Sequence, residues 1–181
     1  MQISYDIKYI NPMIGRGIIC REKIKKGSII WLSNQISYSE YQKKYMIVNV
    51  NDDDNILEYV NNIDKNKNVV TFNETNFEEF LNNLSSTEKV KRFLELSYGV
   101  SGEIHYILDD GKYMNHSTEP NCFTIMKDAT TIALRDIEIG EMLTEDYSTY
   151  THPDYLKCIL KKYDCEPDYY TINGETPSTP E

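Results

Sequence analysis

Two short runs of residues carry the polar groups best suited to binding or catalysis. The first, residues 115–117, places an amide, an imidazole and a hydroxyl on consecutive positions, and a Pro-Asn turn follows at residues 120–121. The second, residues 139–147, opens with an Ile-Gly-Glu turn and ends in two acids and the phenol of Tyr147. Both runs hold more hydrogen-bonding groups and turn formers than a regular helix or strand requires. They are therefore the first candidates for function.

Two other kinds of catalytic site find little support. Cys122 lies close to His116 in sequence, which raises the idea of a thiol nucleophile with a histidine base. However, no residue is suggested that would orient the histidine or stabilise an oxyanion. The short strands expected along the chain also lack the strand–helix–strand pattern of a dinucleotide-binding fold.

A third element stands near the N-terminus, where Gly-Arg-Gly at residues 15–17 precedes a short apolar stretch. In their order and spacing, the three elements resemble those of the SET-domain protein-lysine methyltransferases. That family carries a Gly-x-Gly, an Asn-His-Ser often followed by Pro-Asn, and a Gly-Glu-Glu/Gln-Leu-x-x-Asp-Tyr motif. Here the last motif reads Gly-Glu-Met-Leu-Thr-Glu-Asp-Tyr at residues 140–147. The resemblance covers residues 5–150.

The resemblance implies a protein-lysine N-methyltransferase that uses S-adenosyl-L-methionine and acts on a histone tail or another basic protein segment. Methyl transfer from a sulfonium to an amine requires a neutral, desolvated amine aimed at the methyl group. A nearby positive charge and an apolar channel both serve this, because each disfavours the ammonium form of lysine. Aromatic walls contact the aliphatic stem, and their hydroxyls orient the amine. The alternative is an inactive SET fold that only binds a lysine-bearing partner, and the intact motifs argue against it.

By resemblance, Tyr147 is the first candidate for the catalytic residue, at the junction of amine and cofactor. Tyr98 is a second catalytic candidate and also a candidate for the lysine channel, with plain packing as its alternative. Tyr106 competes for the same channel role, and Tyr150 or Tyr155 offers an aromatic cover for it.

The expected cofactor contacts also come from the resemblance. His116 has an alternative role as a core histidine that pins two crossing chain segments, and both roles can hold together. The expected cofactor-binding residues are Gly15, Arg16, Gly17, Lys112, Tyr113, Asn115, His116 and Tyr147.

No metal site is expected. Many SET proteins place a cysteine directly after Asn-His-Ser and join it to three later cysteines around zinc. Here that position is Thr118, and only Cys158 and Cys165 follow Tyr147. Four thiolate ligands cannot be assembled in that way, so we predict no structural zinc. A helix over residues 153–163 is the expected substitute for closing the lysine channel.

Composition places limits on the partners. The chain has 181 residues, 40% hydrophobic and 27% charged, with a net charge of −10. This acidity disfavours direct nucleic-acid binding and would attract a lysine-rich protein segment, although it also simply favours solubility. No membrane-spanning run or signal-peptide pattern is visible and the four cysteines lack disulfide spacing, so an intracellular protein is expected. A homodimer is left open.

The pattern of short segments predicts a mostly β (α+β) domain with a few short helices. By resemblance this is the SET β-clip-type fold of small twisted sheets with a C-terminal pseudoknot. The predicted elements are strands at 3–9, 18–20, 29–32 and 104–108, a helix capped by Ser85 and ended by Tyr98-Gly99, a hairpin at 122–126 and 130–134, and a helix from 153.

Domain organisation is also expected from the resemblance. Residues 1–150 form the SET domain, with a variable insert at about 33–97 that includes solvated loops at 51–55 and 61–68. Three adjacent aspartates at 52–54 lack the spacing of a calcium loop. Residues 151–181 form a helix and a loose tail that complete the substrate channel.

Overall fold

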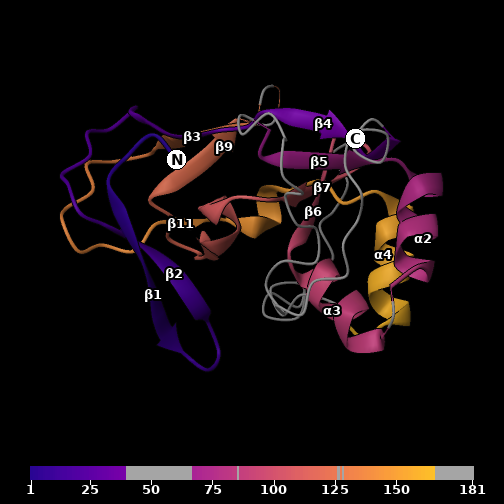
Figure 1. Cartoon of the computed structure of the whole chain (residues 1–181). Helices are drawn as coiled ribbons and strands as arrows, with labels where there is room; N and C mark the ends of the chain where they lie inside the picture. The colour runs from indigo at the N-terminus through magenta and orange to yellow at the C-terminus, as the bar shows by residue number, and fades with distance from the viewer. Residues whose placement is uncertain (40–66, 85, 126, 128, 166–181) are drawn as a thin grey trace. The chain divides into compact units, whose positions relative to one another are not determined.

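The chain divides into two compact units, each assembled from segments that lie far apart in sequence. The computed structural model describes residues 1–39, 67–84, 86–125, 127 and 129–165 (Figure 1). The first unit comprises Met1–Ile36, Asn61–Val70 and Ile107–Tyr147, and the second comprises Ser37–Val60, Thr71–Tyr106 and Ser148–Glu181.

Small sheets form the framework of the first unit. β1 and β2 make an antiparallel hairpin, β3, β10 and β9 form an antiparallel sheet in that order, and β8 and β11 pair in parallel. The short 3₁₀ helix η1 leads directly into β8. The bounds are β1 Tyr5–Asn11, β2 Gly15–Cys20, β3 Ile29–Leu32, η1 Asp110–Tyr113, β8 Asn115–His116, β9 Cys122–Ile125, β10 Thr130–Ala133 and β11 Thr144–Glu145.

A further sheet has the strand order β4-β5-β7-β6. Within the second unit, β6 and β7 pair antiparallel, with Ser97 opposite Tyr106 and Val100 opposite Glu103. The remaining bounds are β4 Gln35–Ser37, β5 Val69–Phe72, α2 Glu74–Asn82, α3 Thr87–Glu95, β6 Ser97–Val100, β7 Glu103–Ile107, η2 Tyr147–Thr149 and α4 Asp154–Lys162.

An apolar cluster fills the first unit and reaches the two polar runs. Burial of each large apolar side chain contributes about 1.5–3 kcal/mol. Met114 and Leu143 belong to this cluster and directly flank β8 and β11, so the core fixes the positions of both strands. The buried members are Ile18, Cys20, Ile24, Ile30, Tyr113, Met114, Cys122, Ala133, Ile137 and Leu143.

Aromatic rings form the centre of the second unit. Phe72 lies 4.6 Å from Tyr38 and 5.7 Å from Phe93 between ring centroids, and Phe93 stacks on Tyr106 at 4.5 Å. Such ring pairs contribute about 0.5–1.5 kcal/mol beyond the burial of their area. We call this set the aromatic cluster. Its members are Tyr38, Phe72, Phe77, Phe80, Phe93 and Tyr106.

Most of the predicted elements are confirmed. The domain is mostly β with short helices, in several small sheets. Alternating or apolar segments correspond to β1, β3 and β7, the predicted hairpin is β9 and β10, and the late helix is α4, which begins at Asp154. The C-terminal pseudoknot stays a prediction.

Three local predictions are wrong. The cap of α3 is Ser86, whose Oγ accepts the Lys89 N–H at 3.2 Å, and not Ser85. Tyr98-Gly99 does not end this helix, because both residues lie in strand β6. The strand predicted at 18–20 is longer, because β2 begins at Gly15 and includes residues 15–17.

Among the described residues of the region 33–84, three elements were not predicted: β4, β5 and α2. β5 is buried along its length, and α2 begins after Asn73, whose side chain accepts the Asn76 N–H at 3.0 Å. Phe77, Phe80 and Leu81 are the buried face of α2, a helical spacing that was readable in the sequence. The loop predicted at 51–55, most of the loop at 61–68 and the tail from 166 lie outside the described residues.

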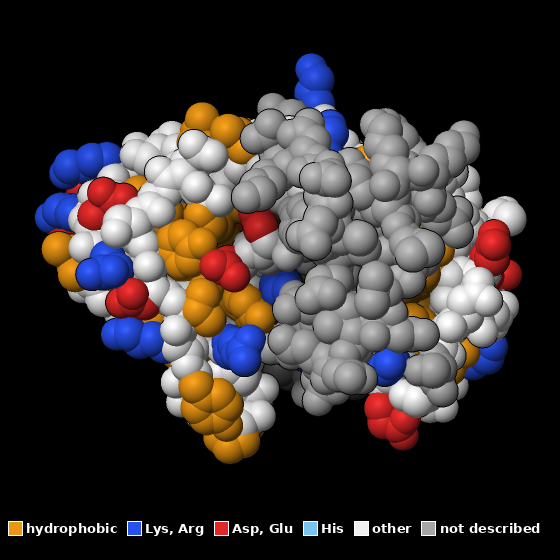
Figure 2. All heavy atoms as spheres, in the orientation of Figure 1, with side chains coloured by type: hydrophobic (Ala, Val, Ile, Leu, Met, Phe, Trp, Pro, Cys, Tyr) orange, Lys and Arg blue, Asp and Glu red, His pale blue; other side chains and the backbone are white. Residues whose placement is uncertain are grey.

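Apolar side chains are exposed at the end of the β1–β2 hairpin, visible in Figure 2 as a hydrophobic group at the lower left. Met13 is 94% exposed and Tyr9 67%. Scattered exposed apolar residues are ordinary on protein surfaces, so they carry no functional assignment. Within the described part of the chain, no helix has the length and apolar character needed to span a membrane.

The buried histidines of the second unit make stability depend on pH. Burial lowers the pKa of His105 and of His152 from 6.5 to about 4. Between these values the unfolded chain binds more protons than the folded one, so the free energy of unfolding should fall as pH decreases from about 6.5 to about 4. Each histidine contributes on the order of 3 kcal/mol to this loss.

Denaturant unfolding of the wild type and of a His105→Leu variant across this pH range tests the expectation. The variant lacks one titrating group, so its unfolding free energy should depend less steeply on pH below 6.5 and equally above pH 7. Equal slopes for the two proteins below pH 6.5 would contradict the assignment of a neutral buried His105.

Candidate functional site

The two polar runs meet in the first unit through the parallel pairing of β8 with β11. Asn115 lies opposite Thr144 and His116 opposite Glu145. The Ser117 N–H extends the ladder by donating to the carbonyl oxygen of Glu145 at 2.9 Å. Residues 31 positions apart in sequence, His116 and Tyr147, are thereby brought together, with ring centroids 5.5 Å apart.

The Asn115 side chain joins this pair of strands to the Gly-x-Gly segment. Its Nδ2 donates to the carbonyl oxygens of Arg16 at 2.9 Å and Tyr113 at 3.2 Å. A Cβ on Gly17 would lie 2.7 Å from Met142 Sδ and 3.1 Å from Asn115 Nδ2. In this structure, therefore, Gly17 serves the close packing of protein on protein.

Gly15 differs from Gly17 in its surroundings. It has a φ of +72°, which L side chains rarely adopt, and a Cβ built there would meet nothing within 4 Å. The preceding turn is held by Asn11, whose Oδ1 accepts the N–H groups of Met13 and Ile14. Glycine is therefore favoured at position 15 by the backbone conformation at the start of β2, and not by lack of space for a side chain.

Two cations flank the buried ring of Tyr113. Arg16 Nη1 donates to the Tyr113 hydroxyl at 3.0 Å, and the Arg16 guanidinium lies 5.6 Å from the ring centroid. Lys112 Nζ lies 5.3 Å from the same centroid. Cation–π contacts of this kind orient both side chains beside Asn115. The side chains of Arg16 and Lys112 together form a small positively charged patch around Tyr113, which precedes β8 in the chain.

The hydrogen bond between Tyr147 and His116 defines the state of the imidazole. The Tyr147 N–H donates to His116 Nδ1 at 3.1 Å, so in this geometry Nδ1 carries no proton and the hydrogen is assigned to Nε2. Asp146 Oδ1 lies 3.9 Å from the same Nδ1. Because Nδ1 accepts the hydrogen bond from Tyr147, its approach to Asp146 is not an ion pair. His116 pins the backbone of Tyr147.

The phenol of Tyr147 is oriented and kept neutral by its surroundings. Its hydroxyl donates to the carbonyl oxygen of Met114. Burial, and to a smaller extent the Glu145 carboxylate, hold the pKa of Tyr147 well above its ordinary value. The hydroxyl therefore remains protonated at neutral and mildly alkaline pH, with lone pairs on its oxygen able to accept a hydrogen bond.

Glu145 is an unusually buried acid, with 5% of its surface exposed. The Thr124 hydroxyl donates to its Oε1, and the Thr124 and Thr131 hydroxyls are 2.6 Å apart. Buried carboxylates require such partners, because desolvation of an unpaired charge is costly. Glu145 thus ties β11 to β9 and β10, a role that the sequence analysis did not identify.

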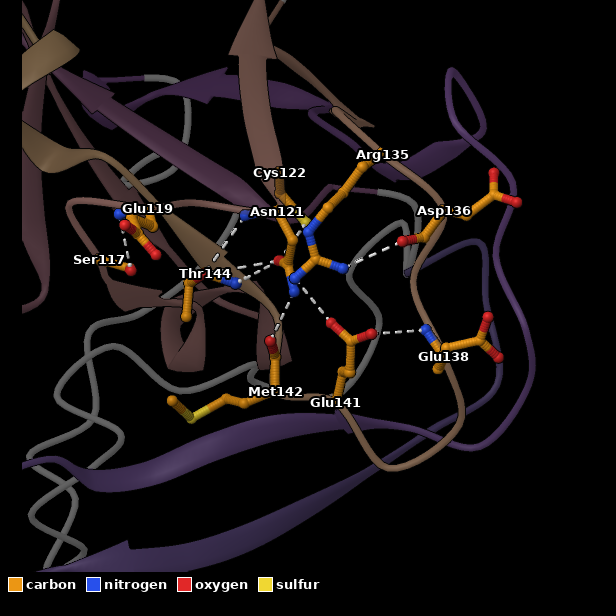
Figure 3. A network of polar contacts seen from close by, with 10 residues as sticks. All are labelled: Ser117, Glu119, Asn121, Cys122, Arg135, Asp136, Glu138, Glu141, Met142 and Thr144. Carbon is orange, nitrogen blue, oxygen red and sulfur yellow. Dashed lines mark hydrogen bonds and ion pairs between the residues drawn. The ribbon is translucent and has the colours of Figure 1, made fainter.

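Asn121 holds the segment that precedes Tyr147 (Figure 3). It is 2% exposed, its Nδ2 donates to the Met142 carbonyl oxygen at 2.8 Å, and its Oδ1 accepts the Thr144 N–H at 2.9 Å. The motif contained this residue, but no role was predicted for it. The contacts make Asn121 a positioning residue for β11.

The turn before β11 has its own polar support (Figure 3). Arg135 Nη2 lies 2.8 Å from Glu141 Oε2, and Glu141 Oε1 accepts the Glu138 N–H at 2.9 Å. The hydrogen bond from Arg135 is the largest cause that lowers the pKa of Glu141. Gly140 has a φ of +88°, which the Ile-Gly-Glu turn requires.

In the second unit, Tyr98 and Tyr150 are brought together. Their ring centroids are 4.9 Å apart, and Tyr98 also lies 5.5 Å from the ring of His105. Tyr98 is half-buried on β6, and Tyr150 follows η2. The two rings form one aromatic pair.

The other two predicted substrate tyrosines, Tyr106 and Tyr155, make contacts of their own. Tyr106 is 1% exposed and stacked within the aromatic cluster, so packing accounts for its ring. Tyr155 is on α4, and its hydroxyl donates to the Gly102 carbonyl oxygen at 3.3 Å. Burial, followed by the carboxylates of Glu74 and Glu103, raises the pKa of Tyr155 to about 12.

Among the described residues, no group of three or more His, Cys, Asp or Glu side chains could hold a metal ion. Cys158 is exposed and Cys165 is half-buried. The absence of a structural zinc stays a prediction from the sequence.

The family model for the SET domain matches residues 15–148, which contain all three motifs. No curated protein sequence matches the chain. The SETMAR methyltransferase domain, a human histone-lysine N-methyltransferase, is 19% identical with a TM-score of 0.40, and the match covers 82% of this chain and 45% of that one. A Plasmodium falciparum protein assigned as a histone methyltransferase is 15% identical with a TM-score of 0.42, over 81% and 95% of the two chains.

A third solved structure, ctPRC2 in an autoinhibited conformation bound to S-adenosylmethionine, reaches a TM-score of 0.52 at 13% identity. The match covers 91% of this chain and 17% of that one, so the chain spans less than half of the matched ctPRC2 chain and of the SETMAR methyltransferase domain. At this level of identity the likeness concerns the fold. With the family match over most of its length, the chain belongs to the SET domain family.

Proposed function

We propose that the chain is an S-adenosyl-L-methionine-dependent protein-lysine N-methyltransferase that acts on a basic protein segment such as a histone tail. One observation carries the proposal: the β8–β11 pairing joins the Asn115-His116 run to a neutral, oriented phenol at Tyr147. Membership of the SET domain family supports it, and so does the S-adenosylmethionine bound to ctPRC2.

The residues of the first unit fit the proposed cofactor by their chemistry. Its α-carboxylate is an anion, for which Arg16 and Lys112 supply cations. Its sulfonium is a cation, to which the oxygens of Met114 and Tyr147 are complementary. The residues proposed to hold it are Gly15, Arg16, Gly17, Lys112, Tyr113, Asn115, His116 and Tyr147. When bound, the cofactor supplies an electrophilic methyl group.

Within this proposal the protein positions a lysine amine. The Tyr147 hydroxyl donates a hydrogen bond to the carbonyl oxygen of Met114, and a phenol oxygen in this role can also accept a hydrogen bond from the N–H of a neutral amine. The hydrogen bond from the Tyr147 N–H to His116 Nδ1 holds the tyrosine backbone in place while the phenol contacts the amine. We assign to Tyr147 the role of orienting the amine, and the proposed reaction uses no dedicated catalytic base.

The proposed substrate is a basic segment, because the chain carries a net charge of −10 and attracts cations. We assign the Tyr98–Tyr150 pair to the aliphatic stem of the lysine, since aromatic rings contact such stems well. Residues 1–150 are proposed as the SET domain, and residues 151–181 as the part that completes the substrate channel.

A Tyr147→Phe variant should lower methyl transfer by about a hundredfold or more and keep cofactor affinity, because only the orientation of the amine is lost. Calorimetry with S-adenosylmethionine and mass spectrometry of mixed histones after incubation measure the two quantities. Tyr9→Phe, an equivalent change at an exposed position, should leave both at the wild-type level.

The outcomes separate two functions. Normal turnover by the Tyr147→Phe variant would remove Tyr147 from the mechanism. A wild-type protein that binds cofactor and lysine peptides but transfers no methyl group would instead be a binding module with a SET fold.

An Asn121→Ala variant should lose stability, because the Met142 carbonyl and the Thr144 N–H would be left buried without their partner. The expected loss is roughly 1–3 kcal/mol for each group. Urea unfolding measures it, with Asn83→Ala as the control: this asparagine is exposed and donates to the Glu79 carbonyl oxygen. The control should change stability by about 0.5 kcal/mol or less. Equal losses for both variants would show that Asn121 is not a structural anchor.

A further inference from the structure

His152 makes a buried hydrogen bond that joins two distant segments of the second unit. Its Nδ1 accepts the N–H of Gly99, in strand β6, at 3.0 Å. The imidazole is 7% exposed, and burial lowers its pKa to about 4, so the acceptor nitrogen carries no proton at neutral pH. No sequence motif marks this residue or its partner for such a role.

The backbone of the two segments approaches too closely for any residue but glycine at position 99. A Cβ there would lie 2.6 Å from the Thr151 carbonyl oxygen and 2.7 Å from both His152 Cα and Pro153 Cδ. The atoms that it would meet are backbone and a proline ring, which cannot move aside as a flexible side chain can. We call this crossing of residues 151–153 over Gly99 the Gly99–His152 clamp.

The clamp adjoins both rings of the aromatic pair along the chain. Tyr98 precedes Gly99 on β6, and Tyr150 stands two residues before His152. The rings meet at 4.9 Å between centroids and are tilted by 49°. Gly99 directly follows Tyr98, and His152 stands two residues after Tyr150, so the clamp holds the backbone next to both rings.

We propose that His152 is a positioning residue that sets the geometry of the Tyr98–Tyr150 pair and thereby the fit of the substrate side chain. This inference rests on the proposed function in one respect, the assignment of that pair to the lysine stem. The imidazole acts through the backbone of Gly99 and contacts no substrate itself. Loss of the acceptor leaves a buried N–H without a partner and releases segment 151–153 from β6.

Three variants isolate the acceptor from the bulk of the side chain. His152→Leu removes the acceptor at similar size, whereas His152→Asn keeps an oxygen close to the place of Nδ1. Gly99→Ala forces the segments apart by sterics alone. Val90→Ala is the control, because it opens a cavity in the core of the second unit at a residue of α3 that is not part of the clamp.

Nuclear magnetic resonance of the full chain with labelled tyrosine and glycine reads the geometry directly. Cross-relaxation between the Tyr98 and Tyr150 rings, and protection of the Gly99 amide from exchange, should be present in the wild type, His152→Asn and Val90→Ala. Both signals should be lost in His152→Leu and Gly99→Ala. If the leucine variant does not fold, Gly99→Ala supplies the same comparison.

Steady-state kinetics with a lysine peptide measures how a change in the ring geometry affects substrate binding and turnover. His152→Leu and Gly99→Ala should raise KM for the peptide by about tenfold to a hundredfold, with a smaller change in kcat and an unchanged affinity for S-adenosylmethionine. His152→Asn should retain most of the wild-type KM, and Val90→Ala should match the wild type.

Rings that stay together in His152→Leu, or rings that separate while KM is unchanged, would overturn the proposal. Failure of the wild type to methylate any lysine would overturn the proposed function alone, because the resonance measurements judge the clamp without activity.

Discussion

The parallel contact between β8 and β11 is the constraint on which the first unit depends. Each strand has two residues, so the ladder alone offers few hydrogen bonds. The structure compensates with side chains: Asn121 satisfies backbone groups on both sides of Leu143, and Glu145 is held by Thr124. Because buried backbone groups must find partners, these polar residues determine where the segment before Tyr147 can lie.

Much of the fold could be predicted from the sequence, because short alternating or apolar runs are typical of strands. β1 is an alternating run, whereas β3 and β7 are short, mostly apolar runs that are buried at successive positions. The Tyr98-Gly99 prediction failed because a glycine after an apolar helical stripe is typical of a helix end, whereas here the missing Cβ serves a close crossing by residues 151–153. α2 was missed because polar residues surround its apolar face, although Asn73 and the spacing of its phenylalanines were available signals.

For the candidate site, the motifs identified which residues converge but not how. All eight proposed cofactor residues fall in the first unit. The role of Gly17 was not predictable, since its neighbour Met142 approaches from a distant part of the chain. The same holds for Asn121 and His152: an asparagine or histidine in a sequence does not reveal which backbone group it will meet.

The division of each unit among distant segments has a consequence for how the protein folds. Asn115 donates to the Arg16 carbonyl oxygen across 99 positions of sequence, and the hairpin that carries Arg16 is made long before β8 and β11. Contacts of such separation require costly loop closure and slow the folding rate. During synthesis from the N-terminus, β1 to β3 are therefore made before the strands of residues 107–147 that complete their unit. The groups around Tyr147 are expected to assemble among the last.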